Sequence, residues 1–131
     1  SGIELPRLSG ACPKWNVYSA FSNPGKISTA ISKMTDGEKY VCIARTVEKG
    51  IAKYGVEKSL LSIGLGCQIK YAKDFVYADG LNLKDEKSES KIGVSCRKCN
   101  LIDCSQRAFP PETRGYNINI NQRGVSIFVN E

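Results

Sequence analysis

Residues 26–47 read KISTAISKMTDGEKYVCIARTV, and this stretch decides the fold. Its first part alternates apolar residues with small polar ones, which predicts a half-buried strand over residues 26–34. A hairpin turn follows, because Asp36-Gly37 accepts the positive φ angles that a tight connection needs. Residues 39–47 are rich in aromatic and β-branched side chains and predict the return strand. The stretch therefore predicts an antiparallel hairpin.

The sequence around the hairpin predicts one further core strand and several short helices. Residues 59–67, SLLSIGLGC, are apolar enough for a strand in the core. The other expected elements are short helices at 15–22 and 70–77, a solvated loop at 84–91, a helical turn at 105–109 and a terminal strand or hairpin at 117–129. Strands mixed with short helices predict an α+β fold with a mainly antiparallel sheet. The length of 131 residues predicts a single domain over 1–131.

The composition points away from an enzyme. The chain contains no histidine, which excludes Ser-His, Cys-His and His-metal catalytic groups. It also has no phosphate-binding G-x-x-x-x-G-K-[ST] loop and no G-x-S-x-G nucleophile motif. The net charge of +6 is modest, and the basic residues are scattered along the chain, so direct nucleic-acid binding is not favoured.

We expect no targeting segment in this sequence. No apolar run approaches the ~20 residues that cross a bilayer, so we expect no membrane contact. No secretory leader is present, which predicts a cytoplasmic protein whose six cysteines are reduced thiols, metal ligands or both.

Three of the cysteines form a cluster. Cys96 and Cys99 make a C-x-x-C unit, and Cys104 follows closely. Two thiolates at this spacing can bind one tetrahedral ion, and neighbouring cations favour the thiolate form. The cluster predicts a structural zinc site with Cys67 as the best-placed fourth ligand, because it ends an expected strand.

Other interpretations of the cluster stay open. Cys12, Cys42 or Asp103 could replace Cys67 as the fourth ligand. The thiols could also remain free of metal, form a redox pair, or belong to an iron–sulfur ligand set of unusual spacing. In a thiol-based redox or metal sensor, Cys96, Cys99 and Cys104 would be the switch.

A longer pattern includes the cluster. Residues 96–111 read CRKCNLIDCSQRAFPP, and this C-R-x-C-x-x-x-D-C-x-Q-R-A-F-P-P pattern resembles the C-terminal domain of the short-chain fatty acyl transcriptional regulators. The resemblance covers roughly residues 8–111, and Lys14 stands where arginine is common in the family. Upstream segments agree in order: GACPKW at 10–15, ARTV at 44–47, LGC at 65–67 and YADGL at 77–81.

The resemblance implies a regulatory domain. Members of this bacterial family carry an XRE-type helix-turn-helix at the N-terminus, and residues 1–25 are too short and proline-broken to form one. We therefore expect an effector-sensing portion that responds to short-chain acyl-CoA, forms a homodimer, and contacts DNA only through a domain absent from this fragment. A sensor of the GAF or PAS type would suit the strand order by analogy.

An acyl-CoA site needs Arg or Lys beside an apolar slot, because the ligand joins phosphates to an acyl chain. The candidates from the family motifs are Arg45, Arg97 and Arg107 for the phosphates, and Trp15, Tyr77 and Phe109 for the adenine or acyl part. Arg45 could instead pair with an acid, and Arg107 could brace the carbonyls of the cysteine cluster. Trp15 and Phe109 could simply pack in a core.

Overall fold

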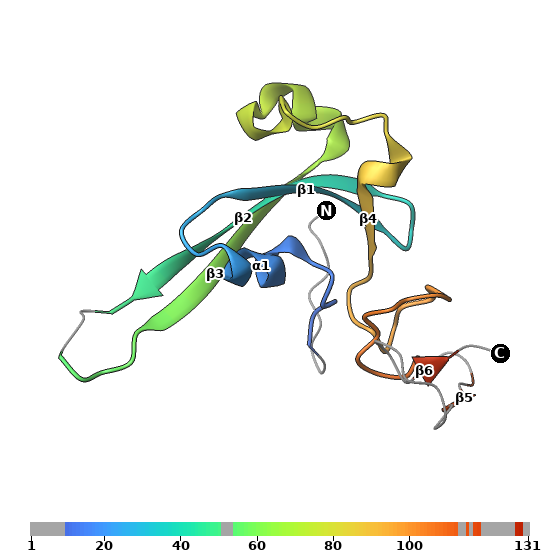
Figure 1. Cartoon of the computed structure of the whole chain (residues 1–131). Helices are drawn as coiled ribbons and strands as arrows, with labels where there is room; N and C mark the ends of the chain where they lie inside the picture. Colours follow the sequence, from blue (N-terminus) through green and yellow to red (C-terminus); the bar gives the residue numbers. More distant parts are fainter. Residues whose placement is uncertain (1–9, 51–53, 113–114, 116, 119–127, 130–131) are drawn as a thin grey trace. The chain divides into compact units, whose positions relative to one another are not determined.

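The computed structural model describes residues 10–50, 54–112, 115, 117–118 and 128–129 (Figure 1). The elements are, in order, α1 (Asn16–Ser19), η1 (Ala20–Ser22), β1 (Ser28–Met34), β2 (Lys39–Lys49), β3 (Ser59–Gln68), η2 (Ile69–Asp74), η3 (Val76–Ala78), η4 (Glu86–Ser88), β4 (Glu89–Ile92), β5 (Asn117–Ile118) and β6 (Phe128–Val129), where η marks a 3₁₀-helix. None of the helices in the described ranges has the length and apolar character needed to span a bilayer.

The chain forms two compact units, which we describe separately. The sheet unit comprises residues 16–33 and 39–90, and the loop unit comprises residues 1–15, 34–38 and 91–131. The main sheet has the strand order β3-β2-β1-β4. β2 pairs antiparallel with both β1 and β3. This sheet with its short helices confirms the predicted α+β class.

The hairpin that decided the fold forms as expected. β1 and β2 pair from Ser28↔Ala44 to Lys33↔Lys39, on either side of the predicted turn. Gly37 adopts φ 90°, a conformation that other residues rarely accept. Helical residues also occur at 16–22, within the predicted helix.

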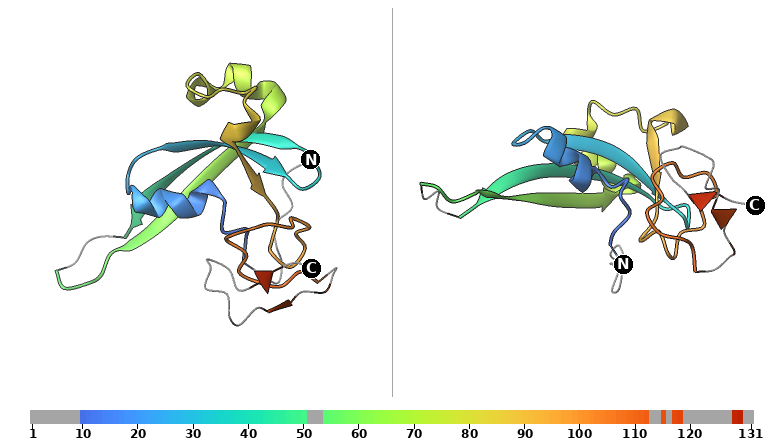
Figure 2. Two further views of the ribbon diagram at one scale, coloured as in Figure 1. Left: turned by 45° about the vertical axis from the view of Figure 1, so that its right-hand side comes forward. Right: turned by 60° about the horizontal axis from the view of Figure 1, so that its bottom comes forward.

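The two faces of the sheet unit differ in side-chain size. Small residues at Ala44, Gly64 and Gly66 share one face of β2 and β3, according to the register. A Cβ atom at Gly64 would collide with the Val17 side chain of α1, so the helix lies very close to the strand. Figure 2 shows α1 against this face of the strands.

A small core lies on the opposite face, at one end of the sheet. Val41 of β2 is fully buried and groups with Ala72 and Ala78 of the 3₁₀ segments. The partly buried side chains that pack against this group are Cys67, Ile69, Phe75, Leu81 and Leu83. The helix expected at 70–77 is thus two short 3₁₀-helices, which bring alanines to the sheet.

β3 is not buried as a core strand: only Cys67, near its end, packs against the small core, so the prediction of a core strand over 59–67 is wrong for the rest of the strand. None of its ten residues is buried. Apolar residues on both faces of a strand normally indicate burial on both faces. Here the strand forms an edge of the described sheet and keeps its apolar residues exposed.

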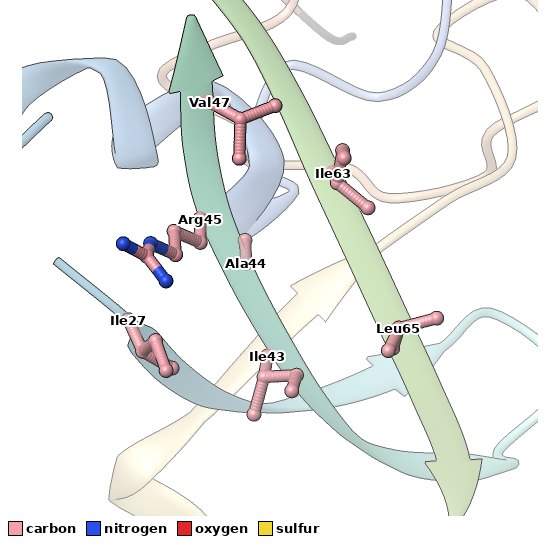
Figure 3. Close-up of a pocket in the computed structure, with 7 residues that line it drawn as sticks. All are labelled: Ile27, Ile43, Ala44, Arg45, Val47, Ile63 and Leu65. Carbon is pink, nitrogen blue, oxygen red and sulfur yellow. The ribbon is translucent and has the colours of Figure 1, made fainter. Parts of the chain in front are cut away.

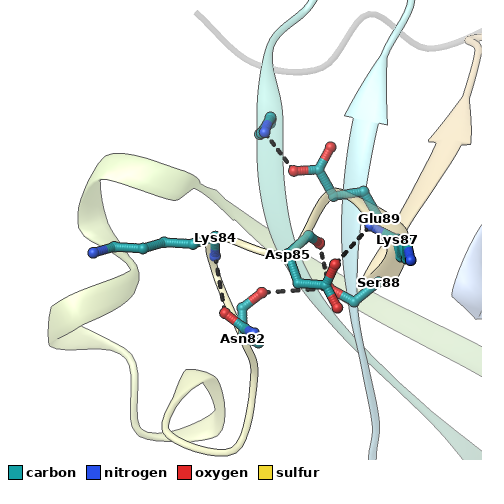
Figure 4. A network of polar contacts seen from close by, with 7 residues as sticks. Asn82, Lys84, Asp85, Lys87, Ser88 and Glu89 are labelled. Carbon is teal, nitrogen blue, oxygen red and sulfur yellow. Dashed lines mark hydrogen bonds and ion pairs between the residues drawn. The ribbon is translucent and has the colours of Figure 1, made fainter.

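The charged segment 84–91 is also more ordered than the predicted solvated loop. It forms η4 and β4, and the Asp85 carboxylate accepts a hydrogen bond from the Lys87 amide at 2.9 Å (Figure 4). The Glu89 side chain is only 4% exposed and forms an ion pair with Lys39 of β2. The loop prediction failed because charge pairing, not apolar alternation, holds this edge of the sheet.

The loop unit contains little regular structure. The Cys12 amide donates to the Val94 carbonyl at 3.2 Å, and the Trp15 indole N–H donates to the Gly93 carbonyl at 3.2 Å. A turn in which the Arg107 amide donates to the Cys104 carbonyl lies at the expected helical turn. β5 and β6 pair antiparallel, as predicted for the terminal segment, although residues 119–127 lie outside the described ranges.

Candidate functional site

The cysteine loop, defined as residues 96–111, is organised by one buried arginine. Arg107 is 5% exposed, and its guanidinium donates to four backbone carbonyls. The bonds reach Leu101 at 2.7 Å, Cys96 at 2.8 Å, Cys99 at 3.2 Å and Phe109 at 3.4 Å. These contacts match the bracing role that the sequence left open for Arg107, and they occupy both terminal nitrogens that would bind a phosphate.

Three buried thiols lie near one another in the loop unit. Cys12, Cys96 and Cys99 are each less than 8% exposed. Burial raises the pKa of the Cys12 thiol; backbone hydrogen bonds from Gly93 and Lys14 oppose this shift, and the charges of Cys96 and Cys99 add to it. The Cys96 sulfur accepts a hydrogen bond from the Ala108 amide at 3.4 Å. Residues far apart in the sequence thus contribute to one group of sulfurs.

The other proposed metal ligands lie in different surroundings. Cys104 is half-buried in the cysteine loop, whereas Cys67 belongs to β3 and interacts with Cys42 of β2. No three Cys, Asp or Glu side chains in the described ranges stand close enough together, as placed, to hold a metal ion. Thiolate sulfurs are suitable zinc ligands, but their placement in the described part of the chain does not form a site, so the zinc site stays a prediction.

Four of the six predicted ligand-binding residues belong to the loop unit. Arg97 stacks on Phe109, with its guanidinium carbon 4.9 Å from the ring centroid. Trp15 is held by its bond to Gly93, and Arg107 is buried as described. These side-chain contacts of Arg97 and Arg107 lie inside the cysteine loop, whereas the Trp15 bond joins two segments that precede it.

The remaining two candidates belong to the sheet unit. The Tyr77 ring packs at a tilt of 59° against Phe75, with 5.7 Å between the ring centroids, and is 45% exposed. Arg45 is exposed on β2 and has no acidic partner among the residues that the structure describes. The alternative that paired it with an acid is therefore not supported.

Arg45 lines an apolar hollow on the sheet, which we call the Arg45 groove (Figure 3). The groove has a volume of about 200 Å³. Its other lining residues come from three strands or their ends: Ile27, Ile43, Ala44, Val47, Ile63 and Leu65. In Figure 3 the Arg45 side chain extends from β2 on the side of Ile27.

A second, more polar hollow adjoins the same arginine. It has a volume of about 390 Å³ and shares Arg45 and Val47 with the Arg45 groove. Its other lining residues are Pro24, Gly25, Thr46, Glu48 and Leu60. The Thr46 hydroxyl accepts a hydrogen bond from the Gly25 amide at 2.9 Å, which fixes the chain at its rim. A ligand with an apolar end and a polar remainder could therefore lie across Arg45.

Charge on the groove face of the sheet is positive. Arg45 and Lys49 lie on this face by the period-two alternation of β2. The only acidic residue in β1, β2 and β3 is Glu48, which the alternation places on the other face and which pairs with Lys58 at 3.0 Å. The face thus combines exposed aliphatic side chains with cations, and suits an amphipathic anion.

Sequence motifs indicated Arg45 but not the aliphatic residues around it. Ile43, Arg45 and Val47 follow the spacing of one strand face, and Ile63 and Leu65 pair beside them. The alternation was visible in the sequence, but it could not tell an exposed face from a buried one.

Comparison with known proteins identifies the family. The family described as "Short-chain fatty acyl coenzyme A regulator, C-terminal" matches residues 1–128. The chain belongs to this family. The resemblance seen in the cysteine loop is therefore confirmed.

Curated relatives of this family member are transcriptional regulators. The chain is 40% identical over 131 residues to the HTH-type transcriptional regulator RamB of Mycobacterium tuberculosis, covering 98% of this chain and 28% of RamB. It is 38% identical to the propionyl-CoA carboxylase regulator of Cereibacter sphaeroides, covering 94% of this chain and 26% of that protein. The chain thus spans about a quarter of the length of these relatives.

A solved structure shows the same fold. A Mycobacterium tuberculosis transcriptional regulator superimposes with a TM-score of 0.79 at 34% identity, covering 91% of this chain and 36% of that one. The matched proteins are named as regulators and not as enzymes, which supports the prediction that this chain is not an enzyme.

Proposed function

We propose that this chain is the effector-sensing part of a transcriptional regulator and that its effector is a short-chain acyl-CoA. The family description and the names of the relatives support this assignment. The observation that carries it is the Arg45 groove, where one exposed cation meets a surface of aliphatic side chains. As a regulator, the whole protein would act in the bacterial cytoplasm and reach DNA through another domain.

The size of the groove favours a short acyl group. Its volume of about 200 Å³ is below the roughly 300–1,000 Å³ of sites that enclose a whole drug-sized ligand. A two- or three-carbon acyl group would lie against Ile43 and Ile63, while Arg45 would pair with a phosphate of the CoA part. The adjoining polar hollow gives room for the chain between them.

Sensing requires that the ligand distinguishes two states of the protein. A ligand that binds both states equally shifts no equilibrium, however tightly it binds. Acyl-CoA would therefore have to bind one arrangement of this part and the DNA-binding domain better than the other. The groove supplies the binding energy, and the attached domain supplies the second state.

Calorimetry with the 131-residue chain tests the proposal. We expect saturable binding of acetyl-CoA or propionyl-CoA, weaker binding of free CoA, and an affinity at least about tenfold lower in Arg45→Ala. Lys58→Ala is the matched control, because Lys58 is an exposed cation outside the groove. Absence of saturable binding, or equal affinities of the two variants, would refute the proposal.

We also propose that the cysteine loop binds a structural zinc ion through Cys96, Cys99 and Cys104. Cys12 suits the fourth position better than Cys67, because its thiol interacts with those of Cys96 and Cys99. The side chains would have to turn toward one another to close the site. When bound, zinc would act as a cross-link between the segment at Cys12 and the cysteine loop.

Metal analysis of protein purified without added zinc tests this second proposal. We expect about one zinc per chain, in line with a four-ligand structural site. The zinc should be lost in Cys12→Ser and kept in Cys67→Ser. Metal-free protein would refute the site, and iron with inorganic sulfide would replace it with an iron–sulfur cluster. Rapid oxidation of metal-free thiols would favour the redox sensor.

A further inference from the structure

β3 offers an open edge of the main sheet. It is the outer strand in the order β3-β2-β1-β4, and no described strand pairs with its outer side. Every second residue of such a strand directs its N–H and C=O groups away from the sheet. Leu60, Leu61, Ile63 and Leu65 expose between 40% and 64% of their surface. A long, apolar, exposed edge is a template for another strand.

The strand lacks the features that normally prevent such pairing. Natural edges carry lysines, prolines or bulges, or are very short. The ten residues Ser59–Gln68, SLLSIGLGCQ, contain no charge and no proline. The pairing with β2 runs without interruption from Lys49↔Ser59 to Tyr40↔Gln68, so no bulge twists the edge away.

We propose that β3 pairs antiparallel with β3 of a second copy of this chain, about a two-fold axis through Ile63. The sequence of β3 is self-complementary in this register. On the groove face Leu61 lies opposite Leu65 of the second copy, which is a favourable aliphatic pair. On the other face the large Leu60 lies opposite Gly66 and Ser62 lies opposite Gly64, so each side chain meets a residue without one.

Charge selects this edge-to-edge arrangement over a stack of two sheet faces. Stacking the groove faces would bring Arg45 and Lys49 of both copies together, with no acid of β1, β2 or β3 on that face. Edge pairing keeps these cations apart. The exposed residues Glu57 and Lys70 lie just beyond the two ends of β3, so antiparallel pairing places opposite charges near each end of the paired strands. A two-fold axis makes the contact closed, so a dimer forms and not a fibre.

Sedimentation of the 131-residue chain over a concentration series tests the surface. We expect a monomer–dimer equilibrium whose dissociation constant rises at least about tenfold in Ile63→Lys, because two like charges would then face each other on the axis. Val76→Lys is the matched control, since Val76 is 77% exposed on η3. Circular dichroism checks that both variants fold. A monomeric wild type, larger assemblies, or a dimer insensitive to Ile63→Lys would overturn the proposal.

Cross-linking tests the register independently of stability. Leu61→Cys and Leu65→Cys variants should form a disulfide between copies when mixed, because opposite residues of paired strands lie within disulfide range. Peptide mass spectrometry separates this disulfide from those of the native cysteines. The control is a mixture of Leu61→Cys with Val76→Cys, whose 61–76 disulfide measures random contact. If the 61–65 disulfide is no more abundant than this control disulfide, the proposed register is wrong.

Discussion

Replacing Arg107 should make the cysteine loop unfold at a lower urea concentration than in the wild type. Its two shortest bonds, to Leu101 and Cys96, are 2.7 and 2.8 Å long and come from a charged group. Hydrogen bonds from charged groups contribute about 1.5–3 kcal/mol each, and two of them give about 3–6 kcal/mol. The longer bonds add little, and water can reach some of the released carbonyls. We therefore expect Arg107→Ala to lower the free energy of unfolding by about 3–5 kcal/mol.

The assay uses a probe inside the same unit. Trp15 is the single tryptophan, and its indole donates to Gly93, so its fluorescence reports on the loop unit. Urea titrations are compared with reductant and chelator present, so that disulfides and metal do not shift the reference state. Arg97→Ala is the control: its side chain stacks on Phe109 at a partly exposed site, where such a contact contributes about 0.5–1 kcal/mol.

The three variants should rank in a fixed order of lost stability, which one set of urea titrations can refute. Arg107→Lys should fall between Arg107→Ala and Arg97→Ala, because one ammonium group cannot reproduce the planar fork that spans separate carbonyls. If Arg107→Ala costs no more than Arg97→Ala, the buried guanidinium is not what holds the cysteine loop.

Three further changes have expected outcomes. Gly64→Ala should cost about 1–3 kcal/mol in thermal unfolding, because the new methyl meets α1, whereas Gly80→Ala enters open space and should be neutral. Glu89→Gln should lower the free energy of unfolding by about 1 kcal/mol or more in the urea assay, because the Glu89 side chain is nearly buried. Glu48→Gln, in the exposed ion pair with Lys58, should lower it by less than about 0.5 kcal/mol. Burial raises the pKa of the Cys42 thiol, so its contribution to stability should be constant below about pH 8.5 and decline as the pH rises through the raised value. Urea titrations between pH 7 and 10 should show this decline, and it should be smaller in the Cys42→Ala variant, which retains the decline due to the buried Cys12 thiol.

Local sequence signals predicted the hairpin well. A period-two pattern, the Asp36-Gly37 turn and a β-branched return strand all act within neighbouring residues, and the structure has β1 and β2 there. The bracing role of Arg107 could also be predicted, as an alternative to phosphate binding, because the carbonyls that it reaches lie nearby in the sequence, within residues 96–109.

The failures have a common physical cause, which is that exposure depends on distant parts of the chain. β3 has the composition of a core strand, but no described element covers its outer side. Glu89 looked solvated, yet a lysine fifty residues away neutralises it at the sheet edge. The approach of Cys12 to Cys96 likewise depends on the bond between its own amide and Val94, which no local pattern reveals.

The core of the sheet unit supports only one end of the long β2–β3 ribbon. Val41 and Cys67 pair where Ala72 and Ala78 cover the sheet, whereas Lys49 and Ser59 pair at the far end, where both are exposed. Amide protons should therefore exchange progressively faster from the first pair toward the second. The ribbon is anchored by the core at one end and free at the other. A force applied at the free end would therefore bend the ribbon just beyond the residues that the core covers.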